Sequence, residues 1–111
     1  MAGDLVYFWI PVPDGEAAKR FYGEVLGWEF TKGDVPGGLQ VTNTKPPAGI
    51  AGGSEASHPQ VCFQVEDLET AMAKVRELGG EAGGPRPGGE GRSVECRDDQ
   101  GTSFHLWAAS P

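Results

Sequence analysis

The stretch Val12-Pro-Asp-Gly-Glu-Ala-Ala-Lys-Arg-Phe-Tyr-Gly-Glu-Val-Leu-Gly-Trp-Glu-Phe30 carries the pattern on which the fold prediction depends. Asp14 is placed to cap a helix, and Gly27 is placed to end it. Between them, apolar side chains recur at helical spacing: Ala17, Ala18, Phe21, Tyr22, Val25 and Leu26. The pattern predicts an amphipathic helix over residues 15–26 with one face packed on a sheet.

Short extended segments flank this helix, and the same order follows in the second half of the chain. Alternating or β-branched residues bounded by Gly and Pro predict strands at residues 5–12, 28–32, 39–43, 49–53, 60–65, 81–84, 92–97 and 102–107. A second helix is expected after Asp67, ending at Gly79-Gly80, with an apolar stripe of Leu68, Ala71, Met72, Val75 and Leu78. The predicted order βαβββ therefore occurs twice.

A fixed offset relates the two halves. Adding 53 to the numbers of residues 12–27 gives six identities in sixteen positions, among them the strand end, the cap and the helix terminator. The pairs are Val12 and Val65, Asp14 and Asp67, Glu16 and Glu69, Ala18 and Ala71, Glu24 and Glu77, and Gly27 and Gly80. We infer an internal duplication, with repeats at about residues 4–54 and 58–108 of a single domain spanning residues 1–111.

Composition excludes several classes of function. Nine Lys and Arg against sixteen Asp and Glu give a net charge of −7, which disfavours nucleic acid and anionic membranes as partners. The apolar run at residues 5–12 is far shorter than the roughly 20 residues that span a bilayer, and no basic segment leads into it. We therefore expect a cytoplasmic protein, with Cys62 and Cys96 as buried reduced thiols.

Alternation along the strands separates two sets of side chains. Phe8, Ile10, Val12, Val61, Phe63 and Val65 are expected to face the helices. The intervening residues should point the other way: Tyr7, Trp9, Pro11, Gln60, Cys62 and Gln64. If two such sheets curl toward each other, these outward residues line a concave groove suited to a small ligand.

Three segments of the chain resemble the vicinal oxygen chelate superfamily, which groups glyoxalase I, bleomycin-resistance proteins and extradiol dioxygenases. They are residues 12–30, residues 65–80, and Asp98-Asp-Gln-Gly-Thr-Ser-Phe-His-Leu-Trp107. The Gly27-Trp28 pair is similar to the small bacterial glyoxalase-like branch. The resemblance implies an α+β fold of two βαβββ modules forming a cup-shaped mixed sheet, with the helices on the outer face and frequent dimerisation.

The resemblance also implies where metal-dependent relatives hold their ion. The matching positions here are Tyr7, Gln60 and His105, with a fourth on the strand at residues 49–53, and only His105 is a usual ligand. Catalytic divalent ions normally need about three ligands from His, Asp, Glu or Cys. We therefore expect no metal and no other cofactor, unless His58, Glu55 or Glu95 completes a displaced site.

The last two strands supply candidate chemistry. If Val94 and Cys96 face the helices, then Ser93, Glu95 and Arg97 face the cup, as do Ser103, His105 and Trp107 on the neighbouring strand. Glu95 beside His105 would raise the proton affinity of the imidazole and fix its tautomer, as proton transfer requires. The alternative is a structural cross-strand charge pair.

Other residues allow alternatives. Trp9 and Trp107 would form flat apolar walls for an aromatic ligand, or pack in a core or a dimer interface. Trp28 is expected in the core against Phe21 or Leu26. Cys62 has no nearby histidine in the sequence, which disfavours it as a nucleophile. Residues 83–89 predict a flexible connection whose Arg86 could meet an anionic substrate.

These observations favour a homodimer that binds a small aromatic or antibiotic-like molecule in its cup without a catalytic metal. The expected ligand contacts are Tyr7, Trp9, Gln60, Cys62, Gln64, Ser103 and Trp107. Two alternatives stay open. One is a divalent-metal lyase, isomerase or dioxygenase of the glyoxalase type, and the other is a metal-free enzyme with His105 and Glu95 as the catalytic pair.

Overall fold

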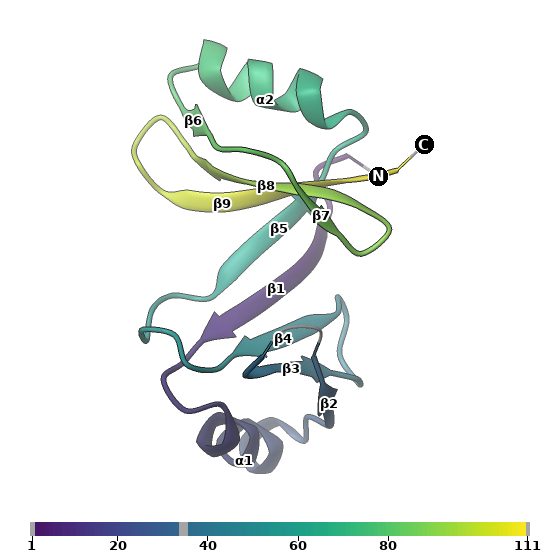
Figure 1. The fold of residues 1–111 in the computed structure, drawn as a ribbon, viewed down its shortest axis with the longest axis vertical. Coiled ribbons are helices and arrows are strands. Elements are labelled where there is room, and N and C mark those ends of the chain that lie inside the picture. Colours follow the sequence, from purple (N-terminus) through teal and green to yellow (C-terminus); the bar gives the residue numbers. More distant parts are fainter. Residues whose placement is uncertain (1, 34–35, 111) are drawn as a thin grey trace. The chain divides into compact units, whose positions relative to one another are not determined.

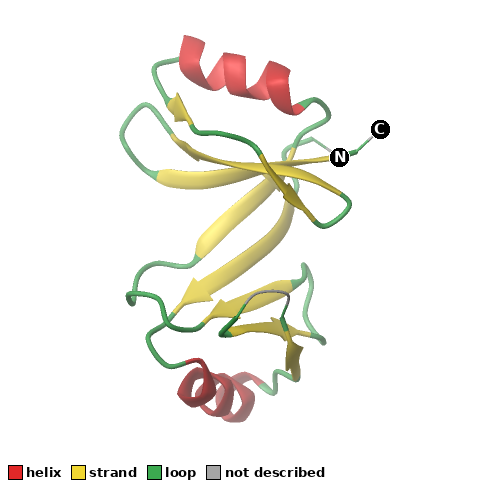
Figure 2. Ribbon diagram, viewed as in Figure 1, coloured by secondary structure: helices red, strands yellow, loops and turns green. Residues whose placement is uncertain are grey.

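The computed structural model describes residues 2–33 and 36–110 and divides the chain into two compact units. Unit 1 comprises Met1–Val6 with Val61–Pro111, and unit 2 comprises Tyr7–Gln60. Each unit contains one helix packed on strands of its own (Figures 1 and 2). The predicted α+β class and the repeated strand–helix–strand order are confirmed, with one added strand in the second repeat.

Unit 2 consists of β1, α1 and a three-stranded meander. The bounds are β1 (Leu5–Pro11), α1 (Gly15–Leu26), β2 (Phe30–Lys32), β3 (Gly38–Val41) and β4 (Ala48–Ala51), with the first two residues of β1 belonging to unit 1. The strand order is β2-β3-β4-β1. The β1–β4 pair is parallel and the other two pairs are antiparallel, which places Trp9 opposite Gly49 and Gln40 opposite Gly49 from the other side.

The limits of α1 are those that the sequence predicts, and their physical causes are visible. The Asp14 carboxylate accepts a hydrogen bond of 3.2 Å from the Ala17 backbone N–H, which satisfies one of the unpaired donors at the helix start. Gly27 follows the helix with φ of 72°, a left-handed conformation that glycine adopts without steric cost.

The predicted buried face of α1 is wrong in part. Ala18 is buried and Tyr22 half-buried, but Phe21, Val25 and Leu26 are exposed. The strip in contact follows Ala18 and Tyr22, which are four residues apart on one side of the helix, with Tyr22 stacked on Trp28. The apolar arc of the helix is therefore wider than the strip that touches the strands.

Aromatic rings do much of the packing beside α1. Trp28 stacks on Tyr22 with ring centroids 5.5 Å apart, and lies 6.2 Å from Phe8 and 6.3 Å from Phe30. Trp28 thus packs where the sequence predicts it, next to the helix, but against different partners. Such offset and edge contacts stabilise a cluster beyond the area that they bury.

Unit 1 has a longer hairpin and a second helix. Its elements are β5 (Gln60–Gln64, its first residue in unit 2), α2 (Leu68–Glu77), β6 (Glu81–Ala82), β7 (Arg86–Gly88), β8 (Gly91–Arg97) and β9 (Ser103–Ala109). The strands run β5-β9-β8, and β6 and β7 both pair with β8. The β5–β9 pair is parallel, and the β8–β9 pair is antiparallel.

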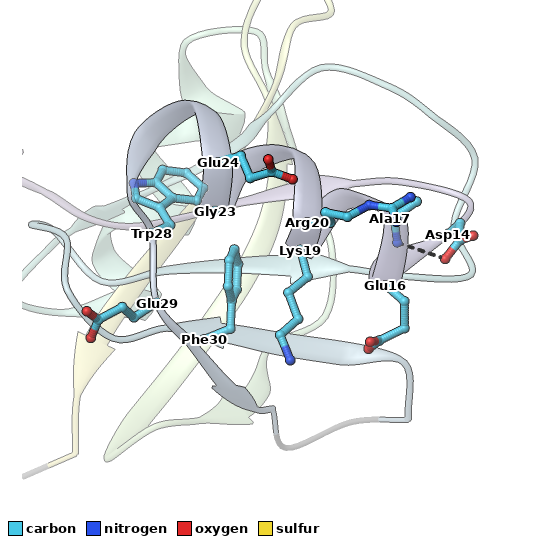
Figure 3. Close-up of a pocket in the computed structure, with 10 residues that line it drawn as sticks. All are labelled: Asp14, Glu16, Ala17, Lys19, Arg20, Gly23, Glu24, Trp28, Glu29 and Phe30. Carbon is cyan, nitrogen blue, oxygen red and sulfur yellow. Dashed lines mark hydrogen bonds between the residues drawn. The ribbon is translucent and has the colours of Figure 1, made fainter.

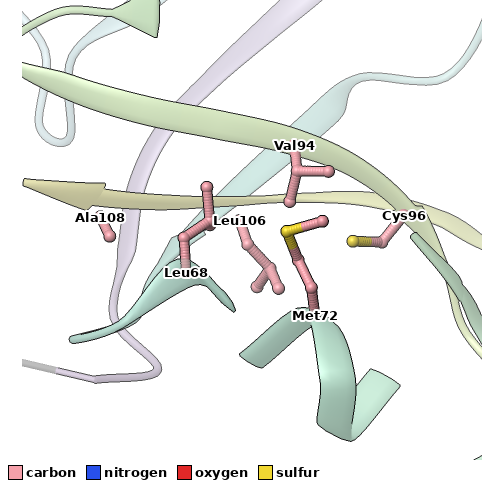
Figure 4. Packing of buried hydrophobic residues seen from close by; sticks show 6 residues of the cluster. All are labelled: Leu68, Met72, Val94, Cys96, Leu106 and Ala108. Carbon is pink, nitrogen blue, oxygen red and sulfur yellow. The ribbon is translucent and has the colours of Figure 1, made fainter. Parts of the chain in front are cut away.

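The core of unit 1 lies between α2 and the β8–β9 hairpin (Figure 4). Its buried members come from alternate positions of the strands and from the inner face of the helix: Leu68, Met72, Val94, Cys96, Leu106 and Ala108. Phe63 and Val65 of the β5 region pack against this cluster, which confirms the alternation predicted for that strand. Leu78 departs from the predicted stripe, because α2 ends at Glu77 and leaves it exposed.

Three further expectations can be compared with the structure. The connection at residues 83–89 is not wholly irregular, because Arg86–Gly88 forms β7 against β8. Both cysteines are buried and free, as predicted. Asp67 occupies the cap position of α2, but its carboxylate accepts from the Thr70 hydroxyl at 2.6 Å instead of from a helix N–H. Among the described residues no helix combines the length and apolarity needed to cross a bilayer.

Candidate functional site

A hollow of about 290 Å³ lies on the face of unit 2 that is turned away from α1. Among the residues that the structure describes, its lining contains two aromatic side chains, one amide and several glycines, and no carboxylate, ammonium or imidazole: Tyr7, Trp9, Gly33, Gly38, Leu39, Gln40, Gly49, Ile50 and Ala51. We call it the Tyr7–Trp9 hollow. An apolar cavity with a few polar groups is typical of sites for small organic ligands.

Strand alternation and one glycine create this hollow. Tyr7 and Trp9 are two residues apart on β1, so they share a face, and their ring centroids lie 6.0 Å apart. A methyl group at position 49 would overlap the Tyr7 hydroxyl. Gly49 therefore allows the phenol ring to lie across β4, and the sequence prediction that Tyr7 and Trp9 point away from the helix is confirmed.

Gln40 on β3 joins this group, although sequence analysis did not single it out. Its side-chain Nε2 donates to the Ala48 carbonyl oxygen at 3.0 Å, and its Oε1 accepts from the Tyr7 hydroxyl at 3.3 Å. Gln40 lies opposite Gly49 in the β3–β4 ladder. In the sequence, Gln40 could be assigned to a face of the sheet only from the alternation of residues 39–43. That predicted strand is too short for its pairing with neighbouring strands to be deduced.

The corresponding face of unit 1 carries ionisable side chains in a row. The β8–β9 ladder pairs Glu95 with His105, and the β5–β9 ladder pairs His105 with Cys62. Paired residues on neighbouring strands project to the same face, with Cβ atoms typically about 5 Å apart. Val94, Cys96 and Leu106 face α2, so this row faces away from the helix. The predicted pairing of Glu95 with His105 is thus present in the register.

Burial governs the protonation of this row. Desolvation lowers the pKa of His105 below its usual 6.5, Glu95 opposes this by favouring the charged imidazolium, and Arg86 reinforces it. Burial raises the pKa of the Cys62 thiol to about 11. At neutral pH the row therefore contains a neutral imidazole next to a protonated thiol. A neutral imidazole can accept a proton, whereas this thiol is a poor nucleophile without help from a base.

A second row follows on the same face. Ser93 pairs with Trp107 across β8 and β9, and Trp107 pairs with Gln64 across β9 and β5. The Trp107 indole N–H donates to the Gly88 carbonyl oxygen at 2.9 Å, so β7 fixes the orientation of this ring. Ser103 lies opposite Arg97 at the far end of the hairpin.

The predicted site residues thus fall into two groups. Tyr7 and Trp9 line the hollow of unit 2, while Cys62, Gln64, Glu95, Ser103, His105 and Trp107 share one face of unit 1. Gln60 ends unit 2, and its Nε2 donates to the His58 carbonyl oxygen at 3.4 Å. The adjacency of Cys62 and His105 was missed because it depends on the pairing of two strands whose residues lie 43 positions apart in the chain.

A larger hollow of about 800 Å³ lies beside α1 (Figure 3). Its rim mixes both signs of charge, with Lys19 and Arg20 interspersed among carboxylates such as Glu16 and Glu24. Its flat surfaces belong to Trp28 and Phe30, whose rings already contact each other. Because exposed charges of opposite sign surround it, this hollow offers no group of polar atoms aimed at one ligand.

The resemblance to metal-dependent proteins implies ligand positions at Tyr7, Gln60 and His105, and these residues do not form a ligand set for a divalent ion. The Tyr7 hydroxyl shares its proton with Gln40, and the β4 position facing it is Gly49, which has no side chain. Over residues 2–33 and 36–110, no three side chains of His, Cys, Asp or Glu come close enough together to hold a metal. The donor chemistry therefore does not fit the glyoxalase type of metal centre.

Comparison with known proteins places these features in a family. The family model described as bleomycin resistance protein-like N-terminal matches residues 4–36. The chain is 31% identical over 110 residues to "Putative glyoxylase CFP32" of Mycobacterium bovis and of Mycobacterium tuberculosis, covering 87% of this chain and 42% of the relative. The chain thus spans about two fifths of the length of these curated relatives.

Solved structures share the fold at low sequence identity. A hypothetical protein of Bacillus halodurans C-125 has a TM-score of 0.74 at 15% identity, covering 100% of this chain and 97% of that one. Methylmalonyl-CoA epimerase of Mycobacterium tuberculosis has a TM-score of 0.67 at 18% identity, covering 98% and 89%. The Streptomyces coelicolor methylmalonyl-CoA epimerase in complex with 2-nitronate-propionyl-CoA has 0.66 at 17%, covering 100% of both chains.

Proposed function

Because the chain belongs to the vicinal oxygen chelate superfamily, we propose that it binds a planar organic molecule in the Tyr7–Trp9 hollow and does so without a catalytic metal. The observation that carries this proposal is the hollow itself. Its described residues supply two aromatic walls, one amide and no charged side chain, in a volume near the lower end of known ligand sites. The match to a bleomycin-resistance-like family model supports a binding role of this kind.

Ligand mapping by NMR tests the proposal. A ¹⁵N-labelled sample is titrated with 2-naphthol as a planar aromatic probe, and we expect shifts concentrated at the backbone amides of Gly38, Gly49 and Ala51. Trp9→Ala should weaken binding about tenfold, because it removes one wall of the hollow. Leu78→Ala is the control, since Leu78 is an exposed apolar residue that follows α2 and does not line the hollow.

Thermal stability provides a second readout for the same proposal. A ligand at a hundred times its Kd adds about 2.7 kcal/mol to the free energy of unfolding. That increment should raise the Tm of a chain of this size by several degrees in the Leu78→Ala control and much less in Trp9→Ala. Shifts confined to another surface, or equal binding by Trp9→Ala, would contradict the proposal. Stoichiometric zinc, nickel, iron or manganese held through His105 would contradict its metal-free part.

A second candidate function is metal-free proton transfer by His105 with Glu95. It is favoured by one observation, the direct pairing of these residues in the β8–β9 ladder. The neutral imidazole would accept a proton from a carbon acid, and the Glu95 carboxylate would stabilise the resulting imidazolium. The epimerases that share the fold suggest a first substrate to test, methylmalonyl-CoA.

Solvent deuterium exchange tests this second candidate. In D₂O with a chelator present, the wild-type chain should incorporate deuterium at the carbon next to the thioester of methylmalonyl-CoA. His105→Ala should abolish incorporation and Glu95→Gln should slow it. His58→Ala replaces the other histidine and should leave the rate unchanged. Exchange that survives in His105→Ala would rule out this pair.

The exposed apolar stripe of α1 supports the expected homodimer. Phe21, Val25 and Leu26 are 59%, 62% and 53% exposed, and they are close to one another on the helix surface. We propose that a second copy of the chain covers them. Val25→Lys should convert a dimer into a monomer in sedimentation velocity, while Ala73→Lys on the exposed side of α2 should not.

A further inference from the structure

The hydrogen bonds of Gln40 set the polarity of the Tyr7–Trp9 hollow. The Ala48 carbonyl oxygen can only accept a hydrogen bond, so the atom of the Gln40 amide that faces it, 3.0 Å away, must be the nitrogen. The amide orientation is therefore fixed by a backbone group. Its oxygen is left to face the Tyr7 hydroxyl at 3.3 Å.

An amide oxygen also can only accept, so the Tyr7 hydroxyl must donate its proton to Gln40. A phenol has a single O–H to donate. Any other hydrogen bond that the Tyr7 oxygen makes, to the protein or to a ligand, is consequently one that it accepts. We call the two hydrogen bonds that link Ala48, Gln40 and Tyr7 the relay. A free hydroxyl can both donate and accept, but within the relay the Tyr7 hydroxyl can only accept further hydrogen bonds.

We propose that this relay selects the ligand: the hollow takes a neutral planar molecule that presents a hydroxyl donor to the Tyr7 oxygen, such as a phenol or an enol. Gln40 is then a positioning residue that acts through Tyr7. The inference rests on the proposed binding function and adds the class of ligand. The described part of the lining supports neutrality, since none of its residues carries a charge that would pair with an anion.

Gly49 is the second part of this arrangement. A Cβ at position 49 would overlap the Tyr7 hydroxyl and lie 3.3 Å from the Leu39 carbonyl oxygen. The phenol ring must then move away from Gln40, because the backbone on the other side cannot. Gly49→Ala therefore breaks the relay without removing any polar group from it.

Three probes share one ring system and differ in their substituent, which donates a hydrogen bond, only accepts one, or carries a negative charge. They are 2-naphthol, 2-methoxynaphthalene and 2-naphthoate, titrated at neutral pH with the amides of Gly38, Gly49 and Ala51 as reporters. A net neutral hydrogen bond changes affinity about two- to tenfold. We expect the wild-type chain to bind 2-naphthol about tenfold tighter than 2-methoxynaphthalene, and 2-naphthoate more weakly than either.

Variants then assign the preference to the relay. Gln40→Met keeps the length of the side chain but removes the amide oxygen that accepts from the Tyr7 hydroxyl. The Tyr7 proton is then no longer held by Gln40, and the preference for 2-naphthol over 2-methoxynaphthalene should fall to about twofold or less. Tyr7→Phe and Gly49→Ala should have the same effect. Tyr22→Phe and Gln100→Met are the matched controls, because they change the other tyrosine and an exposed glutamine outside the hollow.

The outcomes separate the two proposals. If all three probes shift the hollow amides equally, or if Gln40→Met retains the wild-type preference, the relay is wrong although the binding site stands. If none of the probes shifts these amides, both the relay and the proposed binding site are overturned. Should Gln40→Met unfold, Gln40→Glu provides the same test, since a carboxylate accepts from Tyr7 but cannot donate to Ala48. Its preference for the donor probe should then persist while its stability falls.

Discussion

In unit 1, six buried aliphatic, thioether and thiol side chains lie between α2 and the β8–β9 hairpin. In unit 2, the buried apolar side chains among the described residues are those of Ala18, Val41, Ala48 and Ile50, and aromatic rings pack beside α1. The faces turned away from the helices differ as well. Unit 2 has a hollow of aromatic and amide groups, and unit 1 has a row of ionisable groups. The same strand–helix pattern thus supports two kinds of core and two kinds of surface chemistry.

The largest expected effect concerns the two cores. Leu68 is 1% exposed at the centre of the cluster in unit 1, so Leu68→Ala should lower the free energy of unfolding by about 2–5 kcal/mol. Leu78, at the end of the same helix, is 67% exposed, and Leu78→Ala should change stability by less than about 0.5 kcal/mol. Urea denaturation measures both. Equal losses would mean that α2 does not pack as described.

A middle-sized effect concerns the caps of the two helices. Asp14→Ala should cost about 1 kcal/mol, because the Ala17 N–H loses its acceptor. Asp14→Asn should restore most of that loss, since asparagine is an equally good cap. The loss in Asp67→Ala should be smaller, because the Asp67 carboxylate bonds the Thr70 hydroxyl and not a helix N–H. A larger loss at Asp67 would reverse this part of the comparison.

The local pattern of apolar, capping and turn residues was sufficient to predict most helices and strands, but not the contacts between them. The helix at residues 15–26 could be predicted to the residue, because Asp14 and Gly27 act within one turn of its ends. Which side of the helix touches the sheet could not be predicted, because Phe21 and Leu26 are at least as apolar as Tyr22 and the helical pattern does not choose between them. Strand β7 was missed because Arg86-Pro-Gly88 has no strand propensity and pairs only through β8.

The candidate site shows the same division. Tyr7 and Trp9 could be assigned to one face from alternation alone, and Glu95 could be paired with His105 across a short turn. Gln40 and the neighbour relation of Cys62 to His105 depend on ladders between distant segments. The spacing of residues within one segment does not determine how that segment pairs with a distant strand. These contacts could therefore be identified only in the structure.

The smallest expected effect tests whether the row in unit 1 is electrostatically coupled. The pKa of His105 should lie below 6.5 because burial disfavours the imidazolium. Glu95→Gln removes a charge that favours the imidazolium, and should lower the pKa of His105 further. Arg86→Gln should shift it upward. NMR titration of the imidazole protons measures both changes, and an unchanged pKa in Glu95→Gln would mean that the two side chains do not interact.

The same pKa shift has a consequence for stability. Since the unfolded chain binds the proton of His105 more readily than the folded chain does, protonation favours unfolding. The contribution of His105 is therefore fully present above about pH 6.5 and is lost as the pH falls through the lower pKa of the folded state. His105→Gln should lack this component below about pH 6.5, whereas Tyr7→Phe in the Tyr7–Trp9 hollow of unit 2 should keep it. Urea denaturation at several pH values would reverse this assignment if His105→Gln retained the full slope.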